Sequence, residues 1–275
     1  MKIQRISFVG GGNMAASLIG GLISNGYPAD NITVSDLDEA KLQFLANKFG
    51  INATLDSEQM SAESDVLVLA VKPQHMQSVA VQIKSSVQRA KPLVVSIAAG
   101  IREGSIEAWL GGSVAVVRCM PNTPALVKAG ATGLHANRFV SESQKDQTES
   151  LLRAVGVTVW VKDESDLDVV TALSGSGPAY FFLVMEALEQ AAIEAGLDQK
   201  TAQLLTQETA LGAAKMALAS SESAATLRRQ VTSPGGTTEK AIGVMESRGL
   251  PDILRDAVMA AKQRSVELSD ELGGL

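Results

Sequence analysis

Phe8-Val9-Gly10-Gly11-Gly12-Asn13-Met14-Ala15 is the stretch that decides the fold of this 275-residue chain. It contains the pattern G-x-G-x-x-A, directly after an apolar run and at the start of a segment with helical spacing. Gly10 permits a tight turn, Gly12 lets the backbone approach a pyrophosphate, and Ala15 keeps the helix close to the strand. The pyrophosphate would then meet free N–H groups at the positive end of the helix. The stretch therefore predicts a dinucleotide-binding turn.

Apolar runs and helical segments alternate from this turn to about residue 162. We expect strands at 5–9, 32–35, 66–71, 93–98, 114–119 and 157–161, and helices at 13–25 and 39–49. Continuous apolar runs are typical of strands that are buried on both faces. Their alternation with helices predicts a mostly parallel sheet covered on both sides. The expected fold class is α/β, with an N-terminal, doubly wound sheet of the Rossmann type in residues 1–162.

The pattern changes after Lys162, where a polar link leads into helical periods without a convincing strand. We expect helices at 178–195, 199–219, 237–247 and 252–272. The first of these is apolar nearly all round, which indicates burial on every side. A domain of about 110 residues has little room to bury such a helix alone. Residues 163–275 are therefore predicted to form an all-α domain that packs against a second copy of the chain.

Composition argues against several classes of protein. The net charge is −6 and there is no basic run, which argues against a nucleic-acid partner. Cys119 is the only cysteine, so no intrachain disulfide is expected, as suits a reducing cytoplasm. We find no signal-peptide pattern and no apolar run of about 18 residues, and so expect no membrane association. His75 and His135 each stand alone, and no metal site is predicted.

Other strand ends are expected at the same edge of the sheet as the glycine turn. Asp36 ends the second strand, where a carboxylate accepts ribose hydroxyls and favours NAD over NADP. Asp36 would also suit a helix cap, however, and Ser35 beside it could receive a 2′-phosphate. Lys72 could meet ribose or phosphate, or lie in solvent. The small residues at 96–100 leave space for a nicotinamide ring or form a tight turn. NADPH or NADH is therefore expected, with the preference open.

Val231-Thr232-Ser233-Pro234-Gly235-Gly236-Thr237-Thr238 reads as a loop that leads into a helix. Its glycines and threonines would present backbone N–H groups and hydroxyls to a small anion such as a carboxylate. By itself the same stretch also suits an ordinary helix cap.

Together, these stretches resemble the pyrroline-5-carboxylate reductase family. The similarity covers essentially the whole chain and is carried by residues 10–15, 70–73, 96–100, 120–124, 174–180 and 233–238, with Leu227 and Lys240 around the last. It implies NAD(P)H-dependent reduction of the cyclic imine 1-pyrroline-5-carboxylate to L-proline, the last step of proline biosynthesis. It also implies homodimers, often assembled further into decamers.

The resemblance implies a set of site residues as well. Thr238 would orient the imine nitrogen, and the 233–238 loop would meet the substrate carboxylate. The substrate-binding residues are then Ser233, Gly235, Gly236, Thr237, Thr238 and Glu164. The cofactor-binding residues are Gly10, Gly11, Gly12, Asn13, Met14, Ser35, Asp36, Ala70, Val71, Lys72, Pro73, Ala98, Ala99, Gly100, Pro121 and Asn122. Because an iminium is already electrophilic, positioning can supply much of the rate without a metal or strong acid.

Two other functions fit parts of the pattern. A reductase of hydroxy acids on the same two-domain plan usually has a lysine in the helix that starts at Pro178, and this helix carries none before its end. A dinucleotide sensor without activity would have no need of the Gly235–Thr238 loop. We therefore expect a cytoplasmic enzyme. An assay that compares activity on the cyclic imine with activity on hydroxy acids would decide between the two reductases.

Overall fold

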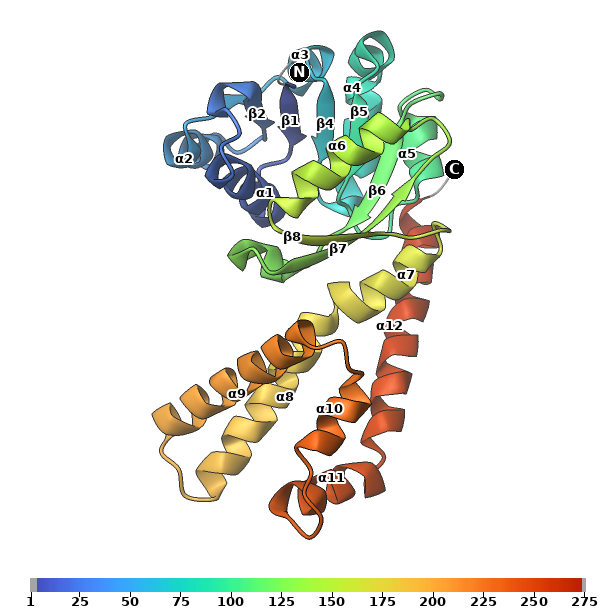
Figure 1. Ribbon diagram of the computed structural model, residues 1–275. Coiled ribbons are helices and arrows are strands. Elements are labelled where there is room, and N and C mark those ends of the chain that lie inside the picture. Colours follow the sequence, from blue (N-terminus) through green and yellow to red (C-terminus); the bar gives the residue numbers. More distant parts are fainter. Residues whose placement is uncertain (1–3, 274–275) are drawn as a thin grey trace. The chain divides into compact units, whose positions relative to one another are not determined.

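Residues 4–273 are described by a computed structural model of the chain (Figure 1). They form two compact units. The first, which we call the sheet unit, comprises the residues up to Ser176 together with those from Ala260 onward. The second, the helical unit, is Gly177–Met259. The expected boundary after residue 162 marks a change of pattern along the chain, whereas these units are grouped by contacts in space. Residues 163–176 and 260–273 are therefore described with the sheet.

One eight-stranded sheet, in the order β3-β2-β1-β4-β5-β6-β7-β8, forms the centre of the sheet unit. Its strands are β1 (Ile6–Val9), β2 (Ile32–Ser35), β3 (Asn52–Thr54), β4 (Val66–Leu69), β5 (Leu93–Ser96), β6 (Val116–Met120), β7 (Gly130–Ala136) and β8 (Gly156–Trp160). All neighbouring strands are parallel except β6 and β7, which are antiparallel. The expected α/β fold with a mostly parallel sheet is confirmed, and β3 and β7 are additional to the six predicted strands.

Helices cover both faces of this sheet, and each face has its own apolar core. Val66 and Val68 of β4 belong to one core, and Leu67 and Leu69 belong to the other. Successive side chains of a strand point to opposite faces, so a continuous apolar run supplies both cores. The first core includes residues of α1 (Asn13–Ser24), α2 (Glu39–Phe49) and α6 (Glu142–Arg153). The second includes residues of α3 (Ser57–Ala62), α4 (Met76–Ala90) and α5 (Glu103–Trp109).

Short helical segments complete the sheet unit. They are η1 (Ala29–Asn31), η2 (Pro73–His75), η3 (Thr123–Val127), α7 (Asp166–Val170) and η4 (Thr171–Gly175). The last part of α12 (Leu250–Leu272) also belongs to this unit, and there Ser265 Oγ donates to Oδ1 of the buried Asp168 at 2.7 Å. A hydrogen bond therefore holds the end of the chain to the segment that leads out of the sheet.

The sequence pattern does not predict β7, because Gly130-Ala131-Thr132-Gly133-Leu134-His135-Ala136 contains few residues that favour strands. The structure explains one of its glycines. A Cβ atom on Gly133 would lie 2.8 Å from Cγ1 of Val170 on α7. The helix thus packs against bare backbone, which is a common reason for glycine inside a strand.

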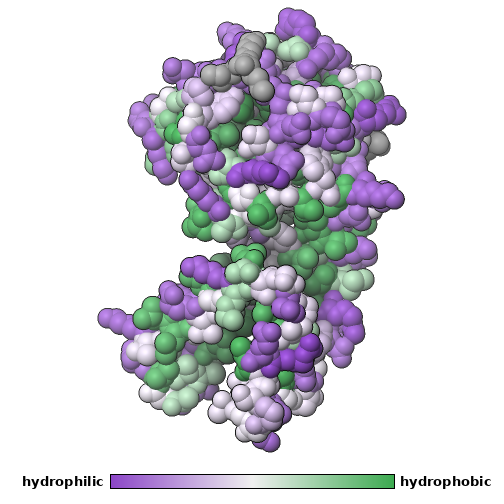
Figure 2. Space-filling view, in the orientation of Figure 1, coloured by the Kyte–Doolittle hydropathy of each residue, from purple (hydrophilic) through white to green (hydrophobic). Residues whose placement is uncertain are grey.

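The helical unit contains α8 (Gly177–Glu194), α9 (Gln199–Ala219), α10 (Ala224–Gln230), α11 (Thr237–Ser247) and the first part of α12. Within residues 177–259, Ala202 is the only apolar residue that is buried. Phe181, Phe182 and Leu183 of α8 are between 64% and 68% exposed. Apolar side chains are visible at the surface of this unit in Figure 2. Contiguous apolar surface of this kind is typical of an interaction site.

The helical stretch Asp166–Glu194 has 29 residues and a mean hydropathy of 1.3 in its most apolar window, so by length and composition it could cross a membrane. This stretch is longer than the apolar run read from the sequence, because α7, η4 and α8 follow one another with only a bend at Ser176. A helix that is covered by a partner subunit has the same composition, since it too is apolar all round.

Candidate functional site

The glycine turn joins the ends of three strands. Gly10 follows β1 with φ of +101°, and its amide donates to the Ser35 carbonyl at the end of β2, at 2.7 Å. A Cβ atom on Gly10 would lie 2.7 Å from the carbonyl oxygen of Ala70, just after β4. A side chain at this position would therefore be strained in its backbone and would also collide with the neighbouring strand end.

Helix α1 begins at this turn with its N-terminus open. Gly12 is the N-cap residue, no side chain caps the helix, and the first turn carries no acidic residue. A Cβ atom on Gly12 would meet nothing within 4 Å, so the approach to the backbone there is free. The free amides of the first turn, which includes Asn13 and Met14, suit a dinucleotide pyrophosphate.

Asp36, directly after β2, is held in place by several donors. Its Oδ2 accepts the Gly11 amide at 2.8 Å, and its Oδ1 accepts the Asp38 amide at 3.1 Å. Lys41 Nζ lies 3.2 Å from Oδ1 and 3.1 Å from Oδ2. Burial acts to raise the pKa of the Asp36 carboxyl, but the two amides and Lys41 outweigh it, and the pKa lies below its usual value. The group is thus a fixed carboxylate beside the glycine turn, whereas the cap of α2 is Asp38.

The neighbouring candidates differ in their access to solvent. Ser35 Oγ is buried and has no hydrogen-bond partner among the described residues. Ala70, Val71, Lys72 and Pro73 follow β4, and Lys72 is exposed at the start of η2. β1 separates β4 from β2 in the sheet. Lys72 and Asp36 are therefore attached to different strand ends on either side of the glycine turn.

The segment after β5 is small and closely packed. Ala98 is buried, and Gly100 has φ of +73°. A Cβ atom on Gly100 would lie 3.4 Å from Cβ of Leu268 on the last part of α12. Ala98, Ala99 and Gly100 thus form a tight turn beside that helix, which is one of the two alternatives considered for this stretch.

Asn122, which follows β6 and the buried Pro121, holds two other segments together. Its Nδ2 donates to the carbonyl and hydroxyl oxygens of Ser174 at 3.1 and 3.3 Å, and its Oδ1 accepts the Ala131 amide at 2.9 Å. Its side-chain amide is therefore engaged with η4 and β7, and its carbonyl accepts the Ala125 amide at 3.1 Å.

Glu164 is part of a partly buried charged network in the sheet unit. Its Oε1 accepts Arg118 Nη1 at 2.9 Å and the Glu103 amide at 2.8 Å. His135 Nδ1 lies 2.8 Å from Glu103 Oε2. Burial raises the pKa of the Glu103 carboxyl, and the charge of Glu164 adds to this rise, while His135 and Arg118 oppose it.

The sequence analysis did not select Arg118, although its side chain is only 2% exposed. A signal was present, because an arginine within the apolar run Val116-Val117-Arg118-Cys119 needs a charged partner when the strand is buried. Neither the identity of that partner nor the role of Glu103 and His135 could be read from the sequence, since they come from other elements.

The loop at 231–238 belongs to the helical unit and ends at another open helix start. Gly236 is the N-cap of α11 and no side chain caps the helix. The Gly236 amide donates to the Ser233 carbonyl at 3.0 Å, and the Gly235 amide donates to Glu239 Oε2 at 2.8 Å. Thr237 and Thr238 occupy the first turn. The loop is therefore closed by its own hydrogen bonds, and the amides at the start of α11 remain for an anion.

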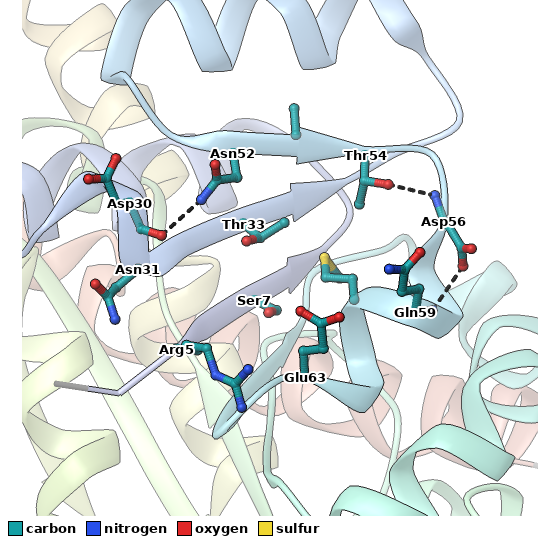
Figure 3. Close-up of a pocket in the computed structure, with 12 residues that line it drawn as sticks. Arg5, Ser7, Asp30, Asn31, Thr33, Asn52, Thr54, Asp56, Gln59 and Glu63 are labelled. Carbon is teal, nitrogen blue, oxygen red and sulfur yellow. Dashed lines mark hydrogen bonds between the residues drawn. The ribbon is translucent and has the colours of Figure 1, made fainter. Parts of the chain in front are cut away.

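A polar pocket of about 350 Å³ in the sheet unit lies away from these residues. Arg5, Asn31 and Asn52, which precede or begin β1, β2 and β3, line it (Figure 3). Ligands of open α/β sheets bind outside the carboxyl ends of the strands, and this pocket lies toward the amino ends. We therefore do not assign it to the cofactor.

Comparisons with known proteins agree with this arrangement. Residues 164–268 match the family model described as pyrroline-5-carboxylate reductase dimerisation, and residues 5–100 match the one described as NADP oxidoreductase, coenzyme F420-dependent. A pyrroline-5-carboxylate reductase of Pseudomonas aeruginosa is 50% identical over 273 residues, which cover 99% of this chain and 100% of that protein.

Two solved structures extend the comparison. One, a pyrroline-5-carboxylate reductase from Coxiella burnetii, has a TM-score of 0.94 and 48% identity, covering 98% of this chain and 100% of the other. The other, a Plasmodium falciparum pyrroline carboxylate reductase with NADP bound, has a TM-score of 0.87 and 28% identity with the same coverage.

Proposed function

This chain belongs to the pyrroline-5-carboxylate reductase family, and we propose that it performs the last step of proline biosynthesis with the residues assigned below. The reaction adds a hydride to the imine carbon of 1-pyrroline-5-carboxylate and a proton to its nitrogen, which gives L-proline and oxidised cofactor. The observation that carries the assignment is that both glycine-rich loops end in helices without a side-chain cap, at Gly12 and Gly236.

The first of these helix starts is assigned to the cofactor, NADPH or NADH. Bound there, the cofactor supplies the hydride. Gly10, Gly11 and Gly12, with the Asn13 and Met14 amides, hold its pyrophosphate. Asp36 and the Ala70–Pro73 segment contact the sugars. Ser35, the buried last residue of β2, precedes Asp36. Ala98–Gly100 and the backbone of Pro121 and Asn122 border the nicotinamide.

The second helix start is assigned to the substrate carboxylate, which carries a negative charge opposite to the positive helix end. Ser233, Gly235, Gly236 and Thr237 form the cradle. Glu239 already takes up the Gly235 amide, so the amides of the first turn of α11 are the ones that meet the substrate.

Thr238 is assigned to the imine nitrogen. A hydroxyl both donates and accepts hydrogen bonds, so it can orient the ring before and after the nitrogen is protonated. Holding the ring in the reactive orientation is worth on the order of 7–11 kcal/mol in favourable cases. Glu164, in the sheet unit, is assigned to substrate binding, and both of its described hydrogen bonds use Oε1. Its proposed role is to position Arg118 and the start of α5 through Oε1, while Oε2 contacts the substrate.

The assembly is a homodimer formed through the dimerisation region. We propose that dimers assemble further, as decamers, in the cytoplasm. The single cysteine, Cys119, is buried, and this suits a reducing compartment.

The deciding experiment measures oxidation of NADH and NADPH with 1-pyrroline-5-carboxylate, with a hydroxy acid as comparison substrate in the reverse direction. Thr238→Ala is expected to lower kcat with little change in the Kd of the cofactor, because Thr238 contacts the substrate alone. Thr209→Ala, an exposed threonine on α9, is the control. An unchanged kcat in Thr238→Ala would remove this residue from the mechanism, and absence of turnover with both cofactors would refute the proposed activity.

A further inference from the structure

We propose that Asp36 makes this reductase select NADH over NADPH. The proposal rests on the cofactor site assigned above and names the dinucleotide that this site takes. It depends on three observations: the contacts that hold Asp36, the charges around it, and the burial of Ser35 Oγ.

Asp36 is fixed at the point where the adenosine end of a dinucleotide meets β2. Four contacts from three residues hold its two oxygens: the amides of Gly11 and Asp38 and the two approaches of Lys41 Nζ. Its side chain is 15% exposed, so part of the carboxylate still faces solvent. A carboxylate has about four lone-pair sites. The two amides and one approach of Lys41 Nζ occupy three of these sites, so the exposed part can accept a hydroxyl of an unmodified ribose when Lys41 keeps a single contact.

Gly11 contributes to this fixation through its lack of a side chain. A Cβ atom there would lie 2.8 Å from Cδ1 of Leu45, 3.3 Å from Cδ of Lys41 and 3.5 Å from Oδ2 of Asp36. The middle glycine of the turn thus lets its amide reach Asp36 and lets Lys41 pass beside it. The turn that holds the pyrophosphate and the carboxylate that meets the ribose are therefore one hydrogen-bonded structure.

The charges around this point oppose a 2′-phosphate. Asp36, Asp38 and Glu39 carry three negative charges within four residues, and Lys41 offsets one of them. Lys41 already contacts both oxygens of Asp36. To bind a 2′-phosphate it would have to leave the carboxylate, which would then face the phosphate as an unneutralised like charge. Lys72 is attached to β4, two strands from β2, or roughly 10 Å away along the sheet.

Ser35 offers no alternative contact for a phosphate. Its Oγ is buried, and the residue is too little exposed for a ligand to contact it. Of the two possibilities that the sequence left open at this strand end, a ribose diol on Asp36 or a phosphate on Ser35, the geometry favours the diol.

The test measures the Kd of NADH and of NADPH for the full-length wild-type protein by calorimetry, without substrate. NADH is expected to bind at least about tenfold more tightly. The preference should shrink as the salt concentration rises from about 0.1 M to about 1 M, because it is a repulsion between charges near the surface. Equal affinities, or tighter binding of NADPH, would overturn the proposal.

Two variants assign the preference to its residue. Asp36→Asn removes the charge but keeps the shape, and it frees Lys41 for a phosphate. It should tighten NADPH binding at least about tenfold relative to NADH. Asp38→Asn changes the net charge by the same amount while Asn still caps α2, and it should alter the ratio far less. If the ratio of the NADPH Kd to the NADH Kd is unchanged in Asp36→Asn, or changes equally in both variants, Asp36 does not determine the preference.

The binding test and the activity assay can succeed or fail independently of each other. If both dinucleotides bind with the expected preference but pyrroline-5-carboxylate is not reduced, the assigned substrate is wrong and the role of Asp36 stands. If pyrroline-5-carboxylate is reduced more efficiently with NADPH, as kcat/KM, and NADPH also binds more tightly, the activity stands and this inference fails.

Discussion

The two units of this chain bury their apolar residues in different ways. In the sheet unit each face of the sheet has a closed core, and strand residues such as Leu67 and Val68 have no exposed surface. In the helical unit Ala202 is the one buried apolar residue, while the large side chains of α8 are exposed. The sheet unit can therefore be stabilised by its own chain, and the helical unit needs a second copy to cover it. Homodimerisation is thus expected to stabilise the helical unit.

The strongest test of this difference is Phe182→Asp on α8. Phe182 is 64% exposed in the single chain, and we expect it to lie in the subunit interface. A charge in an apolar interface is left without water or a partner, so the homodimer should dissociate or fail to form. Light scattering after size-exclusion chromatography measures the mass directly.

Phe44→Asp on α2 is the matched control, because Phe44 is also an exposed phenylalanine, at 58%, but lies in the sheet unit. This variant should keep the mass of wild type. A dimeric Phe182→Asp protein, or an equal loss of mass in both variants, would contradict the assignment of the interface to α8.

A smaller effect is expected within the sheet unit from Glu164→Gln. Arg118 is 2% exposed and would lose its ionised partner, which costs about 3 kcal/mol of unfolding free energy, the lower end of the range for a buried pair. Glu142→Gln, in the exposed pair with Lys145, should cost less than about 1 kcal/mol. Urea unfolding of both variants measures the difference. Similar values for the two would show that the Arg118–Glu164 pair is not stabilising the sheet unit.

Gly10→Ala tests the turn itself. Its φ of +101° and the 2.7 Å approach to the Ala70 carbonyl predict a loss of about 1–3 kcal/mol in unfolding free energy and weaker binding of both dinucleotides, with the dimer preserved. Gly104→Ala on α5 is the control, since a Cβ atom there meets nothing within 4 Å and alanine favours a helix. Dinucleotide binding equal to wild type in Gly10→Ala would show that this turn is not the pyrophosphate site.

What the sequence predicts well in this protein is local. The Gly10–Ala15 turn and α2, which ends at Gly50, depend on residues within a few positions of one another, although the cap of α2 is Asp38 and not the considered Asp36. The boundaries of α9 and α11 agree with the expected ones for the same reason. The family resemblance added the activity, which helix and strand patterns do not contain.

What the sequence does not predict is set by contacts between distant segments. β7 pairs with β6 and β8 and packs under α7 through Gly133, and none of these contacts leaves a periodic pattern in residues 130–136. Likewise, Asp36 is an ambiguous carboxylate in the sequence, and one of the contacts that orient it is the Gly11 amide, 25 residues away. Arg118 and Glu164 are 46 residues apart and come together only in the folded sheet.

The smallest expected effect is a dependence on pH within the same network. Burial and the charge of Glu164 raise the folded-state pKa of Glu103 above its ordinary value of 4.5. The folded protein therefore holds this proton more tightly than the unfolded chain. The resulting stabilisation is fully present below the ordinary pKa and is lost as pH rises through the raised one. Glu103→Gln cannot ionise, so wild type should lose stability relative to this variant as pH rises from about 4 toward neutrality. Urea unfolding at several pH values measures the difference, and parallel pH profiles for the two proteins would mean that folding does not shift the pKa of Glu103. The dimer should be unaffected throughout, because Glu103 and His135 lie in the sheet unit and outside the dimerisation region at residues 164–268.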